Sequence, residues 1–431
     1  MKRLADKEVG KDTEAVRDKG GKISLRNLRT FSSFKDPVYR LYYGGILSQR
    51  ASMNMQLIAR SLLIYRLSGS AAILGLIALA HAIPMLLLSL FGGVIADRLQ
   101  KKYVLLTGLV SSAAVSLGIA LALTLGYLSP DRPGSWWILV AASLLQGTIM
   151  GLMIPSRQAI ISEIVSRKQL MNAVALDTLG MNTVRILAPA LTGFLIDTFN
   201  FEAVYYTMTG MYLVGTISIT FMPLTRKVNI RRSNALADIK EGLRYIRHET
   251  TILLILVFSL FAVVLSMPYL MLMPIFTEDI LKVSATGMGI LISTSGIGAI
   301  SGSLILASRA NRKRGLMLLV GCLILGLALA GFSFSKSWYL SLILIVFVGL
   351  GQAARITLSN ILLQYYVADE YRGRVMSIMI MEFGLTSFGT FSAALMAEVI
   401  GVERALGGFA VTLVLISILT LVFVPRLRKL D

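Results

Sequence analysis

Cysteine and histidine are almost absent from this chain. The 431 residues include one cysteine, Cys322, and two histidines, His81 and His248. A lone cysteine excludes an intramolecular disulfide and a cysteine-based metal site, and two histidines exclude a histidine-rich one. The sequence also lacks a nucleotide-binding loop of the G-x-x-x-x-G-K-[ST] type, which disfavours an ATP-driven pump. We therefore predict no catalytic residues, no metal and no other cofactor, and a protein that is not an enzyme.

Charged residues are scarce as well. They make up 15% of the chain, whereas soluble domains typically contain about 25%, and 55% of the residues are hydrophobic. Apolar runs of 20 or more residues recur from one end to the other. These runs are too long for strands and lack the alternation of a membrane barrel. The composition predicts an all-α, polytopic membrane protein.

The apolar runs define twelve expected transmembrane helices in two six-helix halves. The expected spans are 42–64, 71–96, 103–127, 136–158, 172–196, 203–224, 252–276, 285–307, 315–334, 338–364, 375–399 and 405–425. The corresponding domains are a tail (1–40), a first half (41–225), a central loop with an amphipathic helix (226–251), a second half (252–425) and a short tail (426–431).

Lysine and arginine are distributed very unevenly between the two sides. The tails and loops on the side of the termini carry 33 of them, the opposite loops carry 5, and four lie inside spans, which accounts for all 42. Positively charged loops stay in the cytosol, so we expect both termini there and the protein in the inner or plasma membrane. This topology also explains the net charge of +19, so we expect a lipid bilayer as partner and no nucleic acid. We further expect a monomer.

An internal repeat supports the two pseudo-symmetric halves. Ser70-Ala-Ala-Ile-Leu-Gly-Leu opens the second span, and Ser284-Ala-Thr-Gly-Met-Gly-Ile opens the eighth, at an offset of 214 residues. Two parallel halves are a recurrent design of secondary transporters.

A charged motif between the second and third spans resembles a signature of the major facilitator superfamily. It reads Gly93-x-x-x-Asp97-Arg98-x-x-Lys101-Lys102, with Gln100 where the family usually has a second glycine. Further stretches resemble its bacterial drug and siderophore exporter branch, which includes enterobactin and macrolide exporters. They are Met55-Gln56, Tyr65-Arg-Leu-Ser-Gly-Ser70, Pro155-Ser-Arg157-Gln-Ala, Leu170-Met-Asn-Ala173, Arg185-Ile-Leu-Ala-Pro189-Ala and Val367-Ala-Asp369-Glu370-x-Arg372-Gly373-Arg374-Val-Met376-Ser.

The resemblance implies a two-domain helical bundle that transports a small molecule by alternating access, most commonly coupled to protons. One departure weakens the inference of an antiporter. Exporters of this type often carry G-P-x-x-G-G in the fifth span, whereas this chain has Ala188-Pro189-Ala-Leu-Thr192-Gly193.

The charged motif is also a candidate gate on physical grounds. Asp97 is expected to end the second span, where an acid opposes the helix dipole and needs a cation or another helix N-terminus. Arg98, Lys101 and Lys102 are local candidates. The family resemblance places the distant partner at Arg372-Gly373-Arg374, at the start of the eleventh span. We predict a bridge between the halves here, and a solvated loop that only sets topology is the alternative.

Polar residues inside spans are costly and should face a cavity or a partner. Such residues share helical faces on the first, fifth and tenth spans. The candidates for lining a substrate cavity are Gln49, Arg50, Met53, Asn54, Gln56, Arg60, Arg185, Gln352, Arg355 and Ser359. The excess of arginine indicates an anionic or carboxylate-bearing substrate.

Two carboxylic acids inside spans are candidates for proton coupling. Glu382 lies in the eleventh span with no cation near it on its own helix, and Asp177 lies two turns before Arg185. A buried carboxyl group can exchange a proton near neutral pH because burial disfavours its charged form. The alternative is structural, with Asp177 and the arginines locking helices together.

These features predict a secondary transporter that exports an amphipathic organic compound, drug-like or siderophore-like, by proton-coupled alternating access. An uptake or equilibrative carrier of a small organic anion or lipid on the same fold is one alternative. A membrane receptor or scaffold that transports nothing is another, and it predicts a filled centre instead of polar faces.

Overall fold

The computed structural model describes residues 29–224, 235–308 and 312–431, and every regular element in these ranges is a helix. The first half comprises η2 (Arg29–Lys35), α1 (Pro37–Ser68), α2 (Ala71–Arg98), α3 (Lys101–Thr124), α4 (Trp137–Ile164) and α5 (Arg167–Thr220). Helix α6 (Ala235–His248) connects the halves. The second half comprises α7 (Thr250–Ser266), α8 (Pro268–Ile275), η3 (Phe276–Ile280), α9 (Ala285–Ser308), α10 (Arg314–Ser333), α11 (Trp338–Tyr366), α12 (Arg372–Ile400), α13 (Val402–Phe423) and α14 (Pro425–Arg428).

Local chemistry fixes both ends of α1. Pro37 occupies the first turn, where its missing N–H costs nothing, and Asp36 accepts a hydrogen bond from the backbone N–H of Val38 at 2.8 Å. Gly69 ends the helix in the left-handed conformation, with φ 62°. The tight connection to α2 therefore follows directly from the sequence.

Helix α5 supplies two crossings without an intervening loop. It has 54 residues, far more than the roughly 20 that span a bilayer. Its backbone leaves helical geometry at Asn200, with φ 65° and ψ −176°, between the two expected spans. The seventh crossing is divided instead, because Pro268 begins a new helix after Ser266 and a π-helical turn follows at Phe276–Ile280.

The twelve predicted crossings are confirmed. Ten described segments are long and apolar enough to cross a membrane, and one of them, Gln169–Thr220, contains both crossings of α5. Helix α1 adds the twelfth, since its polar residues lower its mean hydropathy although it is 32 residues long. An even number of crossings places Arg29 and Asp431 on one face, here called the termini face, and the opposite surface is the far face.

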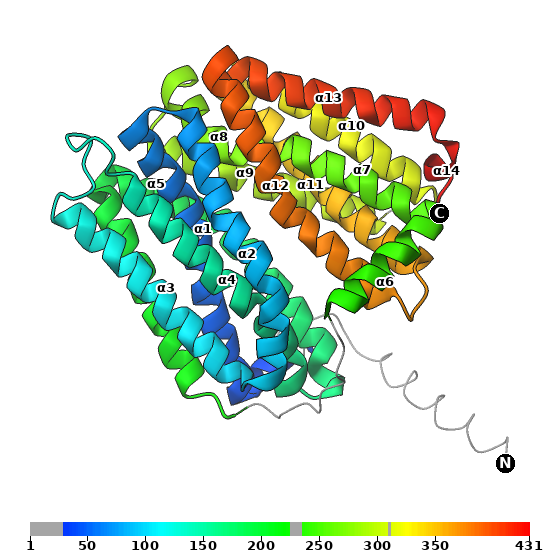
Figure 1. Ribbon diagram of the computed structural model, residues 1–431, viewed down its shortest axis with the longest axis horizontal. Coiled ribbons are helices and arrows are strands. Elements are labelled where there is room, and N and C mark those ends of the chain that lie inside the picture. Colours follow the sequence, from blue (N-terminus) through cyan, green and yellow to red (C-terminus); the bar gives the residue numbers. More distant parts are fainter. Residues whose placement is uncertain (1–28, 225–234, 309–311) are drawn as a thin grey trace, which may run out of the picture.

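The helices form two bundles that meet along two pairs of helices (Figure 1). Helix α2 packs against α12, and α5 packs against α9, so each pair joins the first half to the second. The α5–α9 contact depends on glycine: a Cβ at Gly193 would lie 2.2 Å from the Ala285 carbonyl oxygen, and one at Gly289 would lie 2.4 Å from that of Pro189. Such close backbone approach strengthens packing between helices in lipid.

Candidate transport site

An ion pair joins α1 to α5 in the first half. The Arg50 guanidinium contacts both Asp177 carboxylate oxygens at 2.8 Å and the Asp177 backbone oxygen at 3.0 Å. Both side chains are largely enclosed, with 16% and 19% of their surface exposed. Asp177 is therefore paired with a neighbouring helix, and its partner is Arg50, not Arg185.

The other candidate cavity residues of α1 lie inside the first half, where most of them contact neighbouring residues. Gln49 is fully buried, and its amide nitrogen lies 3.4 Å from Met153 Sδ. Its Oε1 has no hydrogen-bond partner in the part of the chain that the structure describes. Gln56 is also buried, and Asn54 donates back to the Arg50 carbonyl at 2.9 Å. Met53 lies against Arg157 of α4, with 3.9 Å between Met53 Sδ and Arg157 Nη1.

Two arginines of the candidate cavity set have no carboxylate partner among the described residues. Arg60 donates to the Ser143 hydroxyl at 3.3 Å. Arg185 is partly exposed and lies near Tyr269 of the second half. These two side chains can meet an anionic ligand without first breaking an ion pair.

A buried polar chain runs through the second half around Glu382. This carboxylate, only 6% exposed, accepts a hydrogen bond from the Ser259 hydroxyl at 2.9 Å. Arg355, 3% exposed, lies near enough to interact electrostatically with Glu382 and donates to Gln352 at 3.2 Å. Gln352 donates in turn to Ser266 at 3.0 Å.

The buried polar chain around Glu382 retains hydrogen-bonding groups that are not used. Arg355 Nη2 and the Ser359 hydroxyl are buried and have no hydrogen-bond partner among the described residues. Among the described residues, no hydrogen bond or ion pair connects this set to the polar residues of α1. The structure thus assembles two polar groups, one inside each half, and the shared cavity stays a prediction.

The predicted gate lies only partly within the described structure. Gly93, Asp97 and Arg98 fall in the stretch 90–98, whose side chains lie outside the described residues. The two lysines of the motif bind within the first half: Lys101 pairs with Glu163 at 2.5 Å, and Lys102 donates to the carbonyls of Thr220 and Met222. The bridge from Asp97 therefore stays a prediction.

The expected partners of Asp97 have contacts of their own. Arg372 pairs with Asp369 at 2.5 Å. Arg374 pairs with Glu241 of α6 at 3.0 Å and lies over the ring of Tyr371, which itself stacks on Tyr245. Helix α6 is thus attached to the start of α12, the element in which the predicted gate would end.

We expect Glu163→Gln to lower the free energy of unfolding by about 3 kcal/mol, because it leaves the Lys101 ammonium buried without its counter-charge. Each side chain of this pair is 9% exposed. Thermal unfolding of purified protein in detergent measures the change. Glu241→Gln, in a pair that is 25% and 47% exposed, should cost under about 1 kcal/mol. Equal losses of unfolding free energy in the two variants would contradict the view that the Lys101–Glu163 pair is the more buried and more stabilising of the two.

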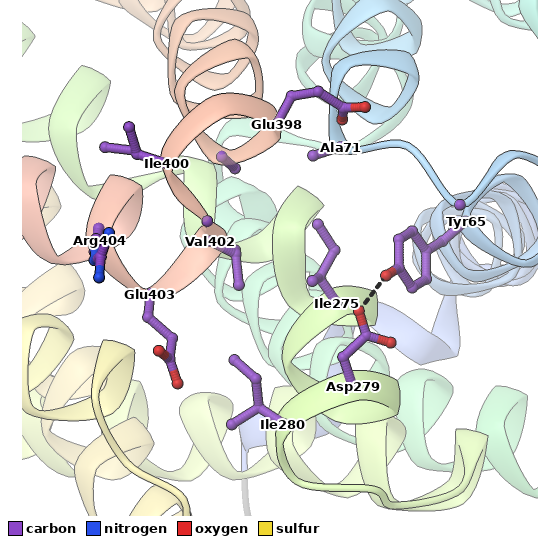
Figure 2. A pocket seen from close by; sticks show the side chains of 13 residues that line it. Tyr65, Ala71, Ile275, Asp279, Ile280, Glu398, Ile400, Val402, Glu403 and Arg404 are labelled. Atoms are coloured by element: carbon purple, nitrogen blue, oxygen red, sulfur yellow. Dashed lines mark hydrogen bonds between the residues drawn. The ribbon is translucent and has the colours of Figure 1, made fainter.

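Carboxylates close the far face between the halves. Tyr65 donates a short hydrogen bond to Asp279, and Arg66 pairs with Glu278 at 2.6 Å, so the end of α1 is tied to η3. A hollow of about 550 Å³ opens beside these contacts, and Figure 2 shows Glu398, Glu403 and Arg404 around it together with the Tyr65–Asp279 pair.

Two further carboxylates cap helices of the opposite half. Glu398 of α12 accepts hydrogen bonds from the Ala72 backbone N–H and the Ser70 hydroxyl, each at 3.0 Å. Asp197 of α5 accepts from the backbone N–H groups of Ala285 and Thr286 at 3.1 and 2.7 Å. Ala72 and Thr286 are equivalent under the 214-residue repeat. The closure is therefore pseudo-symmetric, with each half capping the second helix of the other.

Sequence reasoning did not single out these two caps. The repeat at Ser70 and Ser284 was the available signal, because equivalent helix starts need equivalent hydrogen-bond acceptors. Their partners, Glu398 and Asp197, looked like ordinary polar residues at span ends, and only the packing of α12 on α2 and of α5 on α9 shows their role.

Comparison with known proteins agrees with this architecture. The chain is 25% identical over 365 residues to the staphyloferrin A transporter of Staphylococcus aureus, covering 84% of this chain and 89% of that protein. It is 24% identical over 396 residues to the multidrug efflux pump Tap of Mycolicibacterium fortuitum, covering 89% and 95%. It is 21% identical over 415 residues to macrolide efflux protein A of Streptococcus pyogenes, covering 94% and 100%.

Solved structures show the same fold at low sequence identity. A bacterial homologue of the lysosomal transporter Spinster, in an inward-facing and unoccupied conformation, aligns with TM-score 0.70 and 13% identity over 95% of this chain and 98% of that one. A D-xylose–proton symporter aligns with TM-score 0.71 and 15% identity over 92% and 99%. The family model described as transmembrane secretion effector matches residues 28–431. The chain therefore belongs to this family of major facilitator superfamily transporters.

Proposed function

We propose that the protein exports an amphipathic organic compound, drug-like or siderophore-like, from the cytosol by proton-coupled alternating access. The observation that carries proton coupling is Glu382, a buried carboxyl group held by Ser259 and lying near the buried cation of Arg355. Such a group can hold or release a proton according to the state of its surroundings. Asp177 is the weaker candidate because its carboxylate is already paired with Arg50.

The orientation of the transporter rests on charge. The 33 to 5 distribution of lysine and arginine supports a cytosolic termini face in the cell membrane. With that orientation, the ion pairs and caps of the far face close the protein toward the outside. The relatives named as efflux proteins for drugs and macrolides support the outward direction of transport.

The test is export of a fluorescent amphipathic compound from cells that produce the protein. We expect lower steady-state accumulation than in cells lacking it, and we expect a protonophore to abolish the difference. Cells carrying Glu382→Gln, matched for protein amount in the membrane, are the control for passive effects of expression. Higher accumulation, or export that is insensitive to the protonophore, would contradict the proposal.

An uptake or equilibrative carrier of a small organic anion is the second candidate. Arg60 and Arg185 favour it, because neither has a carboxylate partner among the described residues. In the same assay such a carrier would raise the accumulation of a carboxylate dye or leave it at equilibrium, whatever the state of the proton gradient.

A further inference from the structure

Helix α6 lies at the end of the second half near the C-terminus and packs against α12 and α7 (Figure 1). Its Gly242 and Ile246 are buried, and a Cβ at Gly242 would lie 3.1 Å from the Cβ of Arg374 on α12. The Tyr245 ring stacks on that of Tyr371, with 4.2 Å between the ring centroids. These contacts determine which side of α6 faces outward.

Three cations share the outward side of α6. Lys240, Arg244 and Arg247 are all exposed, and their spacing of four and three residues places them within about 60° of one another around the helix. Among the described residues, no hydrogen bond or ion pair engages any of the three, and Glu241 pairs with Arg374 instead. Like charges at this spacing repel one another, so the group is stabilised by an anionic partner.

An exposed leucine borders these cations. Leu243 is 52% exposed, and it lies about 60° from Lys240 around the helix. Helices that lie in a membrane interface combine apolar side chains, which reach toward the acyl chains, with cations whose stems extend to the headgroups. The outward side of α6 has both components side by side, so its chemistry fits a lipid surface better than bulk water.

The end of α6 lies at the edge of the membrane-spanning region. Only Glu249 separates His248, where α6 ends, from Thr250, where α7 and its apolar crossing begin. A further cation reaches this edge from α14, because the Arg426 guanidinium donates to the Thr251 hydroxyl at 3.1 Å. The C-terminal end of α6 is therefore at the depth of the lipid headgroups.

We propose that the outward side of α6, formed by Lys240, Leu243, Arg244 and Arg247, binds the headgroups of anionic phospholipids. The three cations complement the phosphate charge, and the leucine contacts the adjoining acyl chains. In the orientation proposed above, this surface faces the cytosolic leaflet. Lipid binding requires no transport, so the proposal does not depend on the direction or coupling of export.

The test is thermal unfolding of the purified full-length protein in a neutral detergent, titrated with phosphatidylglycerol, phosphatidylcholine or inorganic phosphate. A ligand that binds the folded protein raises the unfolding temperature with a saturable concentration dependence. We expect phosphatidylglycerol to act at lower concentration than phosphatidylcholine, and we expect a higher ionic strength to weaken its effect. Equal dependence on the two lipids overturns the proposal. The same stabilisation by inorganic phosphate also overturns it, because no lipid would then be needed.

A triple variant assigns the effect to α6. Lys240→Gln with Arg244→Gln and Arg247→Gln should raise the half-saturating concentration of phosphatidylglycerol about 100-fold. Each cation near an anionic surface contributes about 1 kcal/mol, and 1.36 kcal/mol corresponds to tenfold. The substituted side chains are exposed, so the unfolding temperature without lipid should stay close to that of the wild type. Arg244→Lys with Arg247→Lys keeps the charge and should preserve the lipid dependence.

A second triple variant controls for net charge. Arg132→Gln with Lys336→Gln and Arg404→Gln removes the same charge from exposed positions outside α6. We expect it to leave the half-saturating concentration of phosphatidylglycerol close to the wild-type value. If the two triple variants shift this concentration equally, the lipid responds to the overall charge of the protein and α6 is not its binding surface.

Discussion

Replacing Glu382 with glutamine should abolish uphill export while leaving exchange of substrate across the membrane intact. The glutamine keeps the hydrogen bond with Ser259 but cannot release a proton. One proton moving through 100 mV supplies about 2.3 kcal/mol. At 1.36 kcal/mol per tenfold, this energy supports a concentration ratio of about 50. The variant should reach a ratio of about one.

Proteoliposomes separate the two activities. An imposed proton gradient should drive accumulation by the wild type and not by Glu382→Gln, whereas exchange of labelled against unlabelled substrate should persist in both. Asp177→Asn is the matched control: it breaks the pair with Arg50 and should lower thermal stability, but uphill transport should remain. If Asp177→Asn loses proton-driven accumulation and Glu382→Gln retains it, Asp177 and not Glu382 is the acid that couples transport to protons.

Much of the fold was predictable because the length and spacing of apolar runs determine the crossings. The ends of α1 are fixed by Pro37 and Gly69 and lie outside the apolar run 42–64 that predicted this crossing. Helix α5 was less predictable, since a polar stretch around Asn200 normally indicates a loop, and here the helix bends there and continues. Both segments of α5 are buried against neighbouring helices, and Tyr205, for example, is 0% exposed. This tertiary packing favours a continuous helix, and it cannot be recognised from the local sequence.

The pairing of charges was much less predictable than the crossings. The sequence offered Asp177 and Arg185, two turns apart on one helix, as residues that lock helices together but named no partner, and the structure pairs Asp177 with Arg50 on a different helix. Partners between helices depend on how each helix is rotated and tilted, and a hydropathy pattern specifies neither.

The two caps across the far face give the second large effect. Asp197→Ala combined with Glu398→Ala should shift the protein toward a state open at the far face by about 30-fold. Loss of a helix cap costs roughly 1 kcal/mol, so two lost caps cost about 2 kcal/mol, and 1.36 kcal/mol corresponds to tenfold. Either single variant should give about fivefold by the same conversion. The starts of α2 and α9 then lose acceptors that only the closed arrangement supplies.

Cysteine labelling from the far side measures this shift, because the native Cys322 is buried and should react slowly. Ser293→Cys places a thiol on α9 where the native hydroxyl contacts the Ile186 carbonyl of α5, so it becomes accessible only when the halves separate. We expect the double variant to raise the labelling rate of this thiol about 30-fold, in proportion to the open population. Glu403→Ala lies in the same hollow without a described hydrogen bond and should leave the rate unchanged. Equal rates in Glu403→Ala and the double variant would show that the caps do not hold the far face closed. Among the described polar contacts, its closure would then depend on the Tyr65–Asp279 and Arg66–Glu278 pairs.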